Sequence, residues 1–544
     1  LSPNAPAQGL SKVGAVLVVG GGVGGVQAAL DLAESGLKVH LVDDSSSIGG
    51  VMAQLDKTFP TNDCSMCILS PKLVECGRHL NIEILTYSKI EKVLGEAGSF
   101  EVHVKQMPRY IDVAKCTGCG ECAKYCPADA IDLYNEGLSE RASIHVKYPQ
   151  AVPLAYVIDR EVCIGCGLCQ NVCLADAVHY DDKEKEITLN VGAIILAPGL
   201  EEFEAASKSE YGYGRYSNVV TSIEFERILS ASGPFRGRVQ RPSDGEIPRK
   251  IAFIQCVGSR DVTCGNGYCS SVCCMYATKE AVIAKEHQKE VEPTIFYIDM
   301  RSYGKDFDRY IERAEEEYGV RFVRCRVSSV REDPETKQLR IRYESEGGKL
   351  VEEEFDLVVL SVGFVSSKSI RELAQRIGVE LDEYGFCKTP TFHPFETSRP
   401  GIFVCGMFSS PKDIPETVTQ ASGAAACAGG LLSSARATLV KSKEYPGELS
   451  VQGEPPRIGV FICHCGINIG GVVDVPSVVE YARTLPRVVH AEANLYTCSS
   501  DTQKAIKERI KEHSLNRVIV ASCSPRTHEP LFQETIREAG LNRY

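Results

Sequence analysis

The sequence predicts an α/β fold in which parallel strands alternate with helices. Residues 15–19 are a short continuous apolar run, typical of a buried strand, and helical apolar spacing follows over 26–34. A similar apolar run lies at 250–254, and strand and helix patterns alternate again after 457. Strands connected through helices run parallel and form open sheets, which is the architecture we expect here.

Glycines follow the first strand in the order GxGxxG, at Gly20, Gly22 and Gly25. A tight turn, the close approach of a pyrophosphate and helix–strand packing each require a missing Cβ, while helix amides face the phosphates. The next strand, 38–42, ends at Asp43, where a carboxylate can accept ribose hydroxyls. This order predicts a dinucleotide site; the alternative is a glycine-rich turn without a ligand.

FAD is favoured over NAD because more segments of the chain match the pattern of an FAD-binding domain. Two glycines follow the second strand, a strand over 193–196 leads to a glycine, and 401–406 repeats that form before a helix rich in small residues. The N-terminus of that helix would place positive dipole beside the flavin. The expected FAD contacts are Gly20, Gly22, Gly24, Gly25, Asp43, Gly49, Gly50, Gly199, Gly406, Thr417 and Gln420.

These features resemble the two-nucleotide-domain flavoprotein fold of thioredoxin reductase. One departure is Met407, since that family usually has an aspartate there that contacts the flavin ribityl chain. The resemblance implies a second nucleotide unit at strand 250–254. The motif QCVGSR at 255–260 has one glycine where two or three are needed, so we expect no nicotinamide dinucleotide there.

The same region holds five cysteines, Cys256, Cys264, Cys269, Cys273 and Cys274. Five thiols this close predict a metal cluster, with a redox disulfide or plain burial as the alternatives. Because a cluster takes four ligands, one of the five is spare.

The clearest signal is an internal repeat with the spacing CxxCxxCxxxC. Three thiolates two residues apart wrap three corners of a cubane, and the fourth in each run reaches the partner cluster, whereas zinc sites use two pairs. We therefore expect an inserted ferredoxin-like domain with two 4Fe-4S clusters. One set is Cys116, Cys119, Cys122 and Cys173, and the other is Cys163, Cys166, Cys169 and Cys126.

The last section of the chain predicts a small α/β iron–sulfur module. Strands are expected at 458–462, 491–496 and 517–521, with helices at 475–485 and 501–512. Parallel strands place their carboxyl ends on one edge, where a further cluster is expected; buried unpaired thiols are the alternative. Its ligands would be Cys463, Cys465, Cys498 and Cys523, with His464 a solvated neighbour.

Composition sets the remaining limits. The 544 residues are 43% apolar and carry a net charge of −12, which disfavours nucleic acid as a partner. The longest apolar run is too short and too rich in glycine to span a membrane. Because the chain starts at Leu1 without a signal-peptide pattern, we expect a processed or partial chain and a cytoplasmic location.

Over nearly its whole length the chain resembles the A-subunit of heterodisulfide reductase, the FAD subunit of flavin-based electron-bifurcating complexes of anaerobes. The residues that carry the likeness are GGGVGG at 20–25, QLDKTFP at 54–60, DCSMCI at 63–68, the inserted ferredoxin, QCVGSR at 255–260, CHCG at 463–466, YTCS at 496–499 and SCSP at 522–525.

The resemblance implies that the ligands in the second nucleotide unit are Cys256, Cys269, Cys273 and Cys274, leaving Cys264 spare. In the family the module that holds Cys463 comes first, whereas here it comes last. A tandem arrangement, a rearranged subunit or a fragment of a longer chain would explain that order. The second ferredoxin usual in the family is also missing.

We therefore expect an FAD-binding domain in three segments, at 1–109, 183–245 and 351–440. The inserted ferredoxin-like domain would occupy 110–182, and the degenerate second nucleotide-binding domain with its cluster 246–350. A linker at 441–456 would lead to the iron–sulfur module at 457–544, which could be an incomplete module.

The predicted function is an oxidoreductase subunit that transfers electrons between FAD and 4Fe-4S clusters, by bifurcation, confurcation or simple relay. The expected partners are other subunits of a redox complex and ferredoxin or a similar carrier, in a hetero-oligomer that could have a dimeric core. Two alternatives are an NAD(P)H-dependent disulfide reductase using Cys64 and Cys67 and a non-catalytic wiring scaffold. This CxxC pair could be a flavin-reduced dithiol, a structural or flavin-contact element, or a partial cluster site with Cys76.

Overall fold

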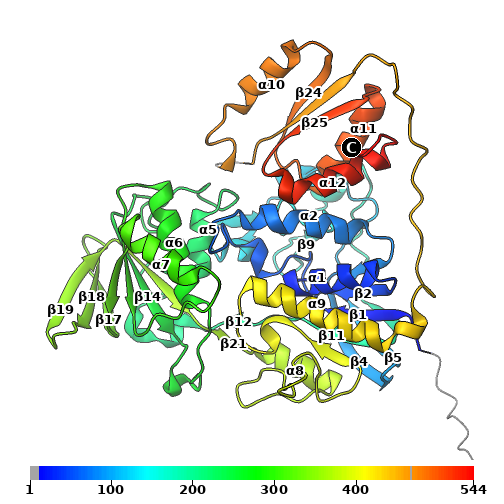
Figure 1. The fold of residues 1–544 in the computed structure, drawn as a ribbon. Coiled ribbons are helices and arrows are strands. Elements are labelled where there is room, and N and C mark those ends of the chain that lie inside the picture. The colour runs from blue at the N-terminus through cyan, green and yellow to red at the C-terminus, as the bar shows by residue number, and fades with distance from the viewer. Residues whose placement is uncertain (1–11, 466–467) are drawn as a thin grey trace, which may run out of the picture.

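The computed structural model describes residues 12–465 and 468–544. Gly466 of the CHCG motif therefore lies outside the described residues. Figure 1 shows two nucleotide-domain-like parts side by side and a third part that covers helix α2.

The first part is built on a five-stranded parallel sheet in the order β22-β11-β1-β2-β3. Its strands are β1 (Ala15–Val19), β2 (Lys38–Val42), β3 (Ile82–Leu85), β11 (Ala193–Leu196) and β22 (Ile402–Val404). The predicted strands 15–19 and 38–42 are confirmed, and the helix expected over 26–34 starts three residues earlier. The helices of this part are α1 (Val23–Glu34), α2 (Ser65–Arg78), α8 (Lys368–Ile377) and α9 (Ile414–Leu431).

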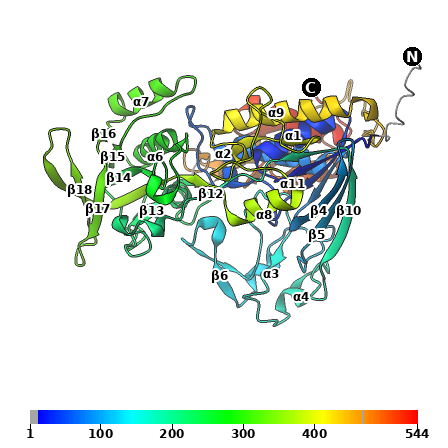
Figure 2. The ribbon, with the colours of Figure 1, turned by 90° about the horizontal axis from the view of Figure 1, so that it is seen from below.

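A second, antiparallel layer carries the insertion. It pairs β10 (Lys185–Val191) with β5 (Ser99–Gln106) and β5 with β4 (Ser88–Glu96). Gln106 lies opposite Lys185 in the ladder, so the chain leaves and re-enters this sheet at neighbouring strand ends. The intervening segment projects below the sheet in Figure 2 without interrupting it.

The inserted segment itself is small and irregular. Its elements are α3 (Glu121–Lys124), β6 (Asp129–Ile131), β7 (Glu140–Ala142), β8 (Ile144–His145), β9 (Val157–Ile158) and α4 (Leu168–Val172). A separate apolar core includes Ile111, Ile144, Ile158 and Cys169, and five further cysteines of the insertion pack against it.

The second part contains another parallel sheet, in the order β13-β20-β14-β15-β16, followed by a three-stranded antiparallel sheet. It extends beyond the expected residues 246–350, because β13 and β20 pair into it from both sides of that range. The strands are β13 (Val219–Thr221), β14 (Lys250–Val257), β15 (Glu292–Tyr297), β16 (Arg321–Arg324), β17 (Val327–Glu332), β18 (Leu339–Glu344), β19 (Leu350–Phe355) and β20 (Leu357–Val362). The helices are α5 (Ser222–Leu229), α6 (Cys273–His287) and α7 (Phe307–Glu316). The short strands β12 (Glu201–Glu202) and β21 (Phe364–Val365) pair where the chain passes between the two parts.

The C-terminal module has the predicted strand–helix alternation. Its parallel sheet has the order β24-β23-β25, and the strand expected at 491–496 lies a few residues earlier. Its elements are β23 (Ile458–Cys463), α10 (Val475–Thr484), β24 (Val488–Asn494), α11 (Ser500–Glu512), β25 (Arg517–Ala521) and α12 (Pro525–Glu538).

Helix α12 joins this module to the FAD part by lying against α2 (Figure 1). Arg78 of α2 donates to Thr535 at 3.2 Å and forms an ion pair with Glu538 at 3.4 Å. Cys498 and Leu531, each 8% exposed, belong to the apolar core built by the first sheet and its helices. The module is therefore packed into the first part and is not merely tethered to it.

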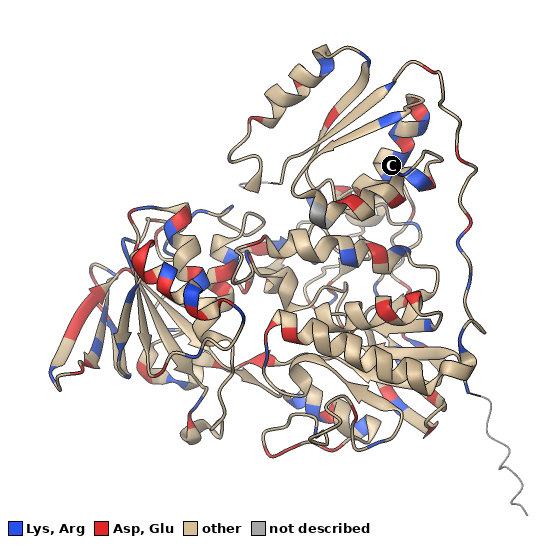
Figure 3. Cartoon of the chain, viewed as in Figure 1, with Lys and Arg blue, Asp and Glu red and all other residues tan. Residues whose placement is uncertain are grey.

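Charges are distributed unevenly over these parts. Lys, Arg, Asp and Glu alternate over the second part and over the helices of the C-terminal module, whereas α9 has no charge after Glu416 (Figure 3). Among the described residues, no helix combines the length and the apolar character needed to cross a membrane.

Candidate flavin cradle and cysteine sites

The turn after β1 has the close packing that the glycine motif requires. A Cβ at Gly25 would overlap the carbonyl oxygen of Gly20, so only glycine lets α1 pack this closely on the strand. At Gly22 the nearest atom to such a Cβ would be the Gly50 Cα, at 4.0 Å. The turn thus has room for a ligand beside Gly22 while it is tightly packed at Gly25.

Asp43 closes the next strand end. One of its carboxylate oxygens accepts a hydrogen bond from Gly21 N at 2.6 Å, and the other accepts one from Ser45 N at 2.8 Å. These bonds hold the acid beside the glycine turn. Gly50, at φ 58°, brings its loop so near that a Cβ would lie 2.9 Å from Gly22 Cα, and Gly49 has φ 132°.

The far end of this cradle lies where β22 meets α9. Gly406 N donates to Gln420 Oε1 at 3.2 Å, and a Cβ at Gly24 would lie 3.0 Å from the Thr417 methyl group. The first turns of α1 and α9, which hold Gly24 and Thr417, thus lie close together. Gly199, at φ 78°, has open space beside it. Together these residues fit an extended dinucleotide such as FAD.

Met407 supplies no carboxylate at this end and packs partly against the second apolar core. The polar group here is Lys412, whose ammonium donates to the Gly406 carbonyl at 2.8 Å and to the Ser410 carbonyl at 2.7 Å. Burial lowers the pKa of Lys412 to about 8. A buried lysine therefore stands near the position where the thioredoxin reductase family usually has an aspartate.

The second part has the sheet of a nucleotide domain without its phosphate loop. Helix α6 begins only at Cys273, so 15 residues separate it from the end of β14 at Val257. A Cβ at Gly258 would overlap the Phe203 ring, which fills the space beside that glycine. A dinucleotide pyrophosphate needs a tight strand–helix turn with an open face, and this loop offers neither.

Cysteines lie in that loop and at both of its ends instead. Cys256 has an unusual positive φ of 61°, and Cys273 and Cys274 stand buried in the first turn of α6. Burial raises the pKa of Cys256, with a smaller raising effect from Cys269, and Arg260 and Arg301 lower it. Four thiols thus lie near one another with arginines alongside.

Cys264 lies apart from these four thiols. Its sulfur is 3.7 Å from the Asp261 carboxylate, which forms an ion pair with Lys208 at 2.5 Å. This placement agrees with the role of spare thiol that the resemblance implies.

The insertion repeats one loop conformation twice. Gly118 and Gly120 have φ 70° and 83°, and Gly165 and Gly167 have φ 70° and 76°. Left-handed glycines in the same positions turn each CxxCxxC run around a common centre. The two helices that follow, α3 and α4, pack against each other.

The crossed ligand sets can be compared with the positions of the thiols. Cys126 lines one cavity with Cys163, Cys166 and Cys169, so the structure brings the second expected set together. Burial, then the neighbouring thiols Cys116 and Cys119, raises the pKa of Cys122 to about 12. Cys173 accepts from Ala177 N at 3.4 Å and packs against the same core as Cys116.

The C-terminal module collects its cysteines at the carboxyl edge of its sheet, as expected. Cys463, Cys465 and Cys498 are buried, and Cys523 is exposed just before α12. A hydrogen bond with Cys465 lowers the pKa of Cys463 to about 6, and burial raises that of Cys498 to about 12.

The CxxC pair joins this group, which sequence reasoning did not anticipate. Cys64 and Cys67, at the start of α2, line the same cavity as the four module cysteines. Cys76 lies further along α2 in the apolar core, with its pKa raised to about 12 by burial. Nine helical residues span about 13 Å, so the structure does not favour a site that Cys76 shares with the pair.

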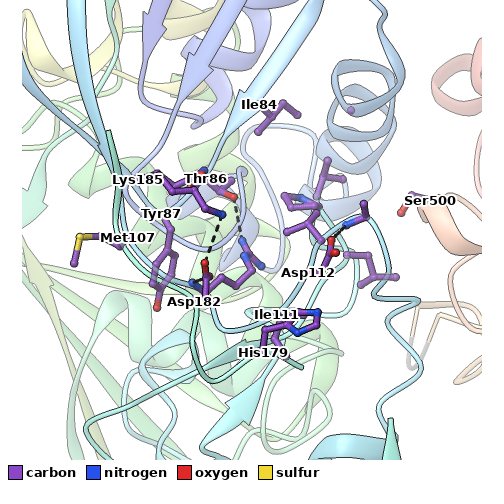
Figure 4. A pocket seen from close by; sticks show the side chains of 18 of the residues that line it. Ile84, Thr86, Tyr87, Met107, Ile111, Asp112, His179, Asp182, Lys185 and Ser500 are labelled. Atoms are coloured by element: carbon purple, nitrogen blue, oxygen red, sulfur yellow. Dashed lines mark hydrogen bonds and ion pairs between the residues drawn. The ribbon is translucent and has the colours of Figure 1, made fainter. Parts of the chain in front are cut away.

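In the described residues, no three His, Cys, Asp or Glu side chains are grouped for a single metal ion. A cavity of about 1070 Å³ opens between α2, the insertion and Ser500 (Figure 4). Arg109 spans one wall, donating to the Thr86 hydroxyl at 3.0 Å and to the Ala155 carbonyl at 3.0 Å. Neither the cysteines nor the glycines discussed above line this cavity.

Three family models match the chain. A model described as FAD dependent oxidoreductase matches residues 15–63, one described as 4Fe-4S dicluster domain matches 115–177, and one described as pyridine nucleotide-disulphide oxidoreductase matches 159–425. The chain therefore carries FAD and 4Fe-4S regions.

Two curated relatives decide the family. The CoB–CoM heterodisulfide reductase iron-sulfur A-subunit of Methanocaldococcus jannaschii is 49% identical over 412 residues, which are 75% of this chain and 63% of that protein. The iron-sulfur A-subunit 2 of Methanopyrus kandleri is 49% identical over 454 residues, which are 83% of this chain and 67% of that protein. The chain belongs to the heterodisulfide reductase A-subunit family. It spans less than two thirds of the M. jannaschii relative.

A solved structure is also similar to this chain. Thioredoxin reductase of T. acidophilum gives a TM-score of 0.44 at 14% identity, over 76% of this chain and 97% of that one. In this heterodisulfide reductase A-subunit family member, the strand pairing itself shows the two five-stranded parallel sheets.

Buried charges lie between the two nucleotide-domain-like parts of this family member. Lys279 of α6 forms an ion pair with Glu226 of α5, both 2% exposed at the side chain, and Glu226 also accepts from Asp56 N at 2.9 Å. Burial lowers the pKa of Lys279 to about 8 and raises that of Asp56. The loop after Gly50 is thereby tied to the second part. The signal in the sequence was a Lys-Glu pair within an otherwise apolar stretch of α6.

We expect Gly25→Val to yield protein without flavin, because the new side chain would collide with the Gly20 carbonyl and push α1 off the strand. The flavin absorbance per polypeptide measures this loss. Gly430→Ala is the control, because a Cβ there meets open space on α9. A Gly25→Val protein that keeps one FAD would show that this turn does not bind the cofactor.

Glu280, next to Lys279, predicts a pH effect on stability. Burial raises its pKa to about 8, whereas glutamate in an unfolded chain titrates near 4.3. Between these values the folded state holds more protons, so stability falls as pH rises. We expect the stability of Glu280→Gln relative to wild type to rise from pH 5 to pH 8, by about 1.4 kcal/mol per pH unit.

Thermal unfolding midpoints at the two pH values measure this gain. Glu316→Gln, which removes an acid from the exposed surface of α7, is the matched control. If the unfolding midpoints of Glu280→Gln and wild type differ by the same amount at both pH values, the expected pH dependence is contradicted.

Proposed function

We propose that this chain is the FAD and iron–sulfur electron-transfer subunit of an oxidoreductase complex. The observation that carries the proposal is the combination of one cradle suited to FAD with three separate groups of thiols. The second nucleotide-like part supplies one of these groups in place of a phosphate loop. Electrons would therefore enter and leave through clusters and partners.

FAD, when bound, takes or gives electrons as a pair and also singly, while 4Fe-4S clusters carry one electron at a time. The protein positions these groups. The glycine turn and Asp43 hold the dinucleotide, and the four-cysteine loops hold clusters. Glu226, which is ion-paired with Lys279, connects the two parts by accepting from Asp56 N in the loop after Gly50. Burial excludes water from the connecting region.

The proposal includes four 4Fe-4S clusters. Two lie in the insertion, one at Cys256, Cys269, Cys273 and Cys274, and one in the C-terminal module. The domains expected from the sequence are retained in it, with the second nucleotide-like part enlarged by β13 and β20.

The partners we propose are other subunits of a multi-subunit redox complex and a ferredoxin-like carrier. A relative from Methanococcus maripaludis, 49% identical over 412 residues, is named as the A-subunit of H2/formate:CoB-CoM heterodisulfide,ferredoxin reductase. The chain would act in a hetero-oligomer, with bifurcation or confurcation as its mode and a dimeric core as one arrangement. We propose a cytoplasmic location, because grouped thiols remain reduced there.

The iron content tests the cluster count. Four cubanes and one FAD give about 16 Fe per flavin in protein purified anaerobically with its partners. Iron, sulfide and flavin analysis measures this ratio. A value near 8 would remove the sites at the Cys256 group and in the C-terminal module.

The response to nicotinamide nucleotides tests the route of electrons. We expect NADH or NADPH alone to leave the flavin oxidised, because Phe203 fills the space beside Gly258. Dithionite should reduce the flavin in the same sample. Rapid bleaching of the flavin absorbance by NADPH alone would instead support the NAD(P)H-dependent disulfide reductase that uses Cys64 and Cys67.

A further inference from the structure

Six thiols from two domains line one cavity. Cys64 and Cys67 come from the FAD part, and four cysteines come from the C-terminal module, more than 390 residues later in the chain. A cluster takes four thiolates, so the module alone already has the required number. The two additional thiols call for an explanation.

The packing of two helices brings these thiols together. Cys64 caps α2, Cys67 lies in its first turn, and Cys523 stands two residues before α12. The bonds from Arg78 to Thr535 and Glu538 hold these helices together. Meanwhile Ser70 of α2 donates to the Cys498 carbonyl at 3.5 Å.

The two cysteines of the CxxC pair have different surroundings. Cys64 Sγ accepts from Cys67 N at 3.2 Å and lies 3.8 Å from the amide nitrogen of Asn468. Cys67 Sγ instead lies 3.8 Å from Cys523 Sγ, across the domain boundary. Cys64 thus contacts its own helix, the Cys67 side chain and an amide of the module, whereas Cys67 is the member of the pair that contacts a module thiol.

The contact between Cys67 and Cys523 continues into the module. Cys523 contacts Cys465, and Cys465 contacts Cys463, through their side chains. The thiols of Cys67, Cys523, Cys465 and Cys463 therefore form an unbroken run of contacts. Cys498 lies outside this run and belongs to the apolar core of the FAD part.

The walls of the cavity also favour a metal. Among the described residues that line it there is no lysine or arginine, while Asp56 contributes a carboxylate that is 4% exposed and has one oxygen without a hydrogen-bond partner. Thiolates gathered in such surroundings need a positive charge that the side chains of the wall do not supply. Iron supplies that charge and binds thiolate directly.

We infer that Cys67 is a ligand of the iron–sulfur cluster in the C-terminal module, with Cys463, Cys465 and Cys523 as the other three. The cluster is then bound between two domains, and Cys498 is a wall residue. The inference rests on the proposed presence of a cluster in this module, and it replaces Cys498 of the expected ligand set.

The test compares Cys67→Ala, Cys64→Ala and Cys498→Ala in the full chain, purified anaerobically. Iron and sulfide per FAD, together with electron paramagnetic resonance of dithionite-reduced protein, are measured. We expect Cys67→Ala to lose about 4 Fe per FAD and one cluster signal. Cys64→Ala and Cys498→Ala should keep both.

The opposite pattern, with iron lost from Cys498→Ala and retained in Cys67→Ala, would overturn the inference. If Cys523→Ala also keeps all its iron, the module holds no cluster, and the inference fails with it. The flavin and the ferredoxin signals would persist in that case, so the proposed electron-transfer function would stand with fewer clusters.

A purely structural role for Cys67 is tested by Cys67→Ser, which keeps the size of the side chain. Ligation predicts an altered cluster signal or loss of iron in this variant. Unchanged iron content and an unchanged spectrum would mean that Cys67 only packs against the module, and would overturn the inference.

Discussion

The packing of α2 between two neighbours determines where the thiols of this chain meet. Residues of α2 such as Leu69 and Leu73 are buried in the core that α1 and the first sheet build, and its other side lies against α12. A helix fixed on both sides cannot turn its N-terminus away from the module. The position of Cys67 beside Cys523 thus follows from apolar packing and from the Arg78 bonds.

The insertion likewise keeps its cysteines apart from the sheet that supports it. It enters and leaves at paired strand ends, where Asp182 accepts from Arg109 N at 3.0 Å and from Tyr110 N at 3.2 Å. Closing the insertion in this way leaves the hydrogen bonds between β5 and β10 intact. A segment that has its own small core can therefore carry two cysteine runs without weakening the flavin sheet, since the two cores are separate.

Features that depend on residues close together in the sequence could be predicted from it. The strand at 15–19 is a continuous apolar run, and the glycine turn and the repeated cysteine loops depend on spacing within a few residues. Strand β20 could not be assigned to its sheet, because its pairing with β13 and β14 joins segments more than 100 residues apart. The meeting of Cys67 with Cys523 and the ion pair between Lys279 and Glu226 are likewise products of tertiary packing, which no periodicity records.

The second nucleotide-like part shows how a fold can be kept while its ligand site changes. Its parallel sheet needs only buried apolar strands, and β14 and β20 satisfy that need without reference to any nucleotide. The loop after β14 is free of that constraint. Cys256, the last residue but one of β14, can therefore have a strained φ of 61° beside that loop, and the start of α6 is delayed until Cys273. Strain of this kind in a non-glycine residue persists only where surrounding contacts fix it, and it is common at functional sites. Cysteine thiols thus gather around the loop that would have bound a phosphate.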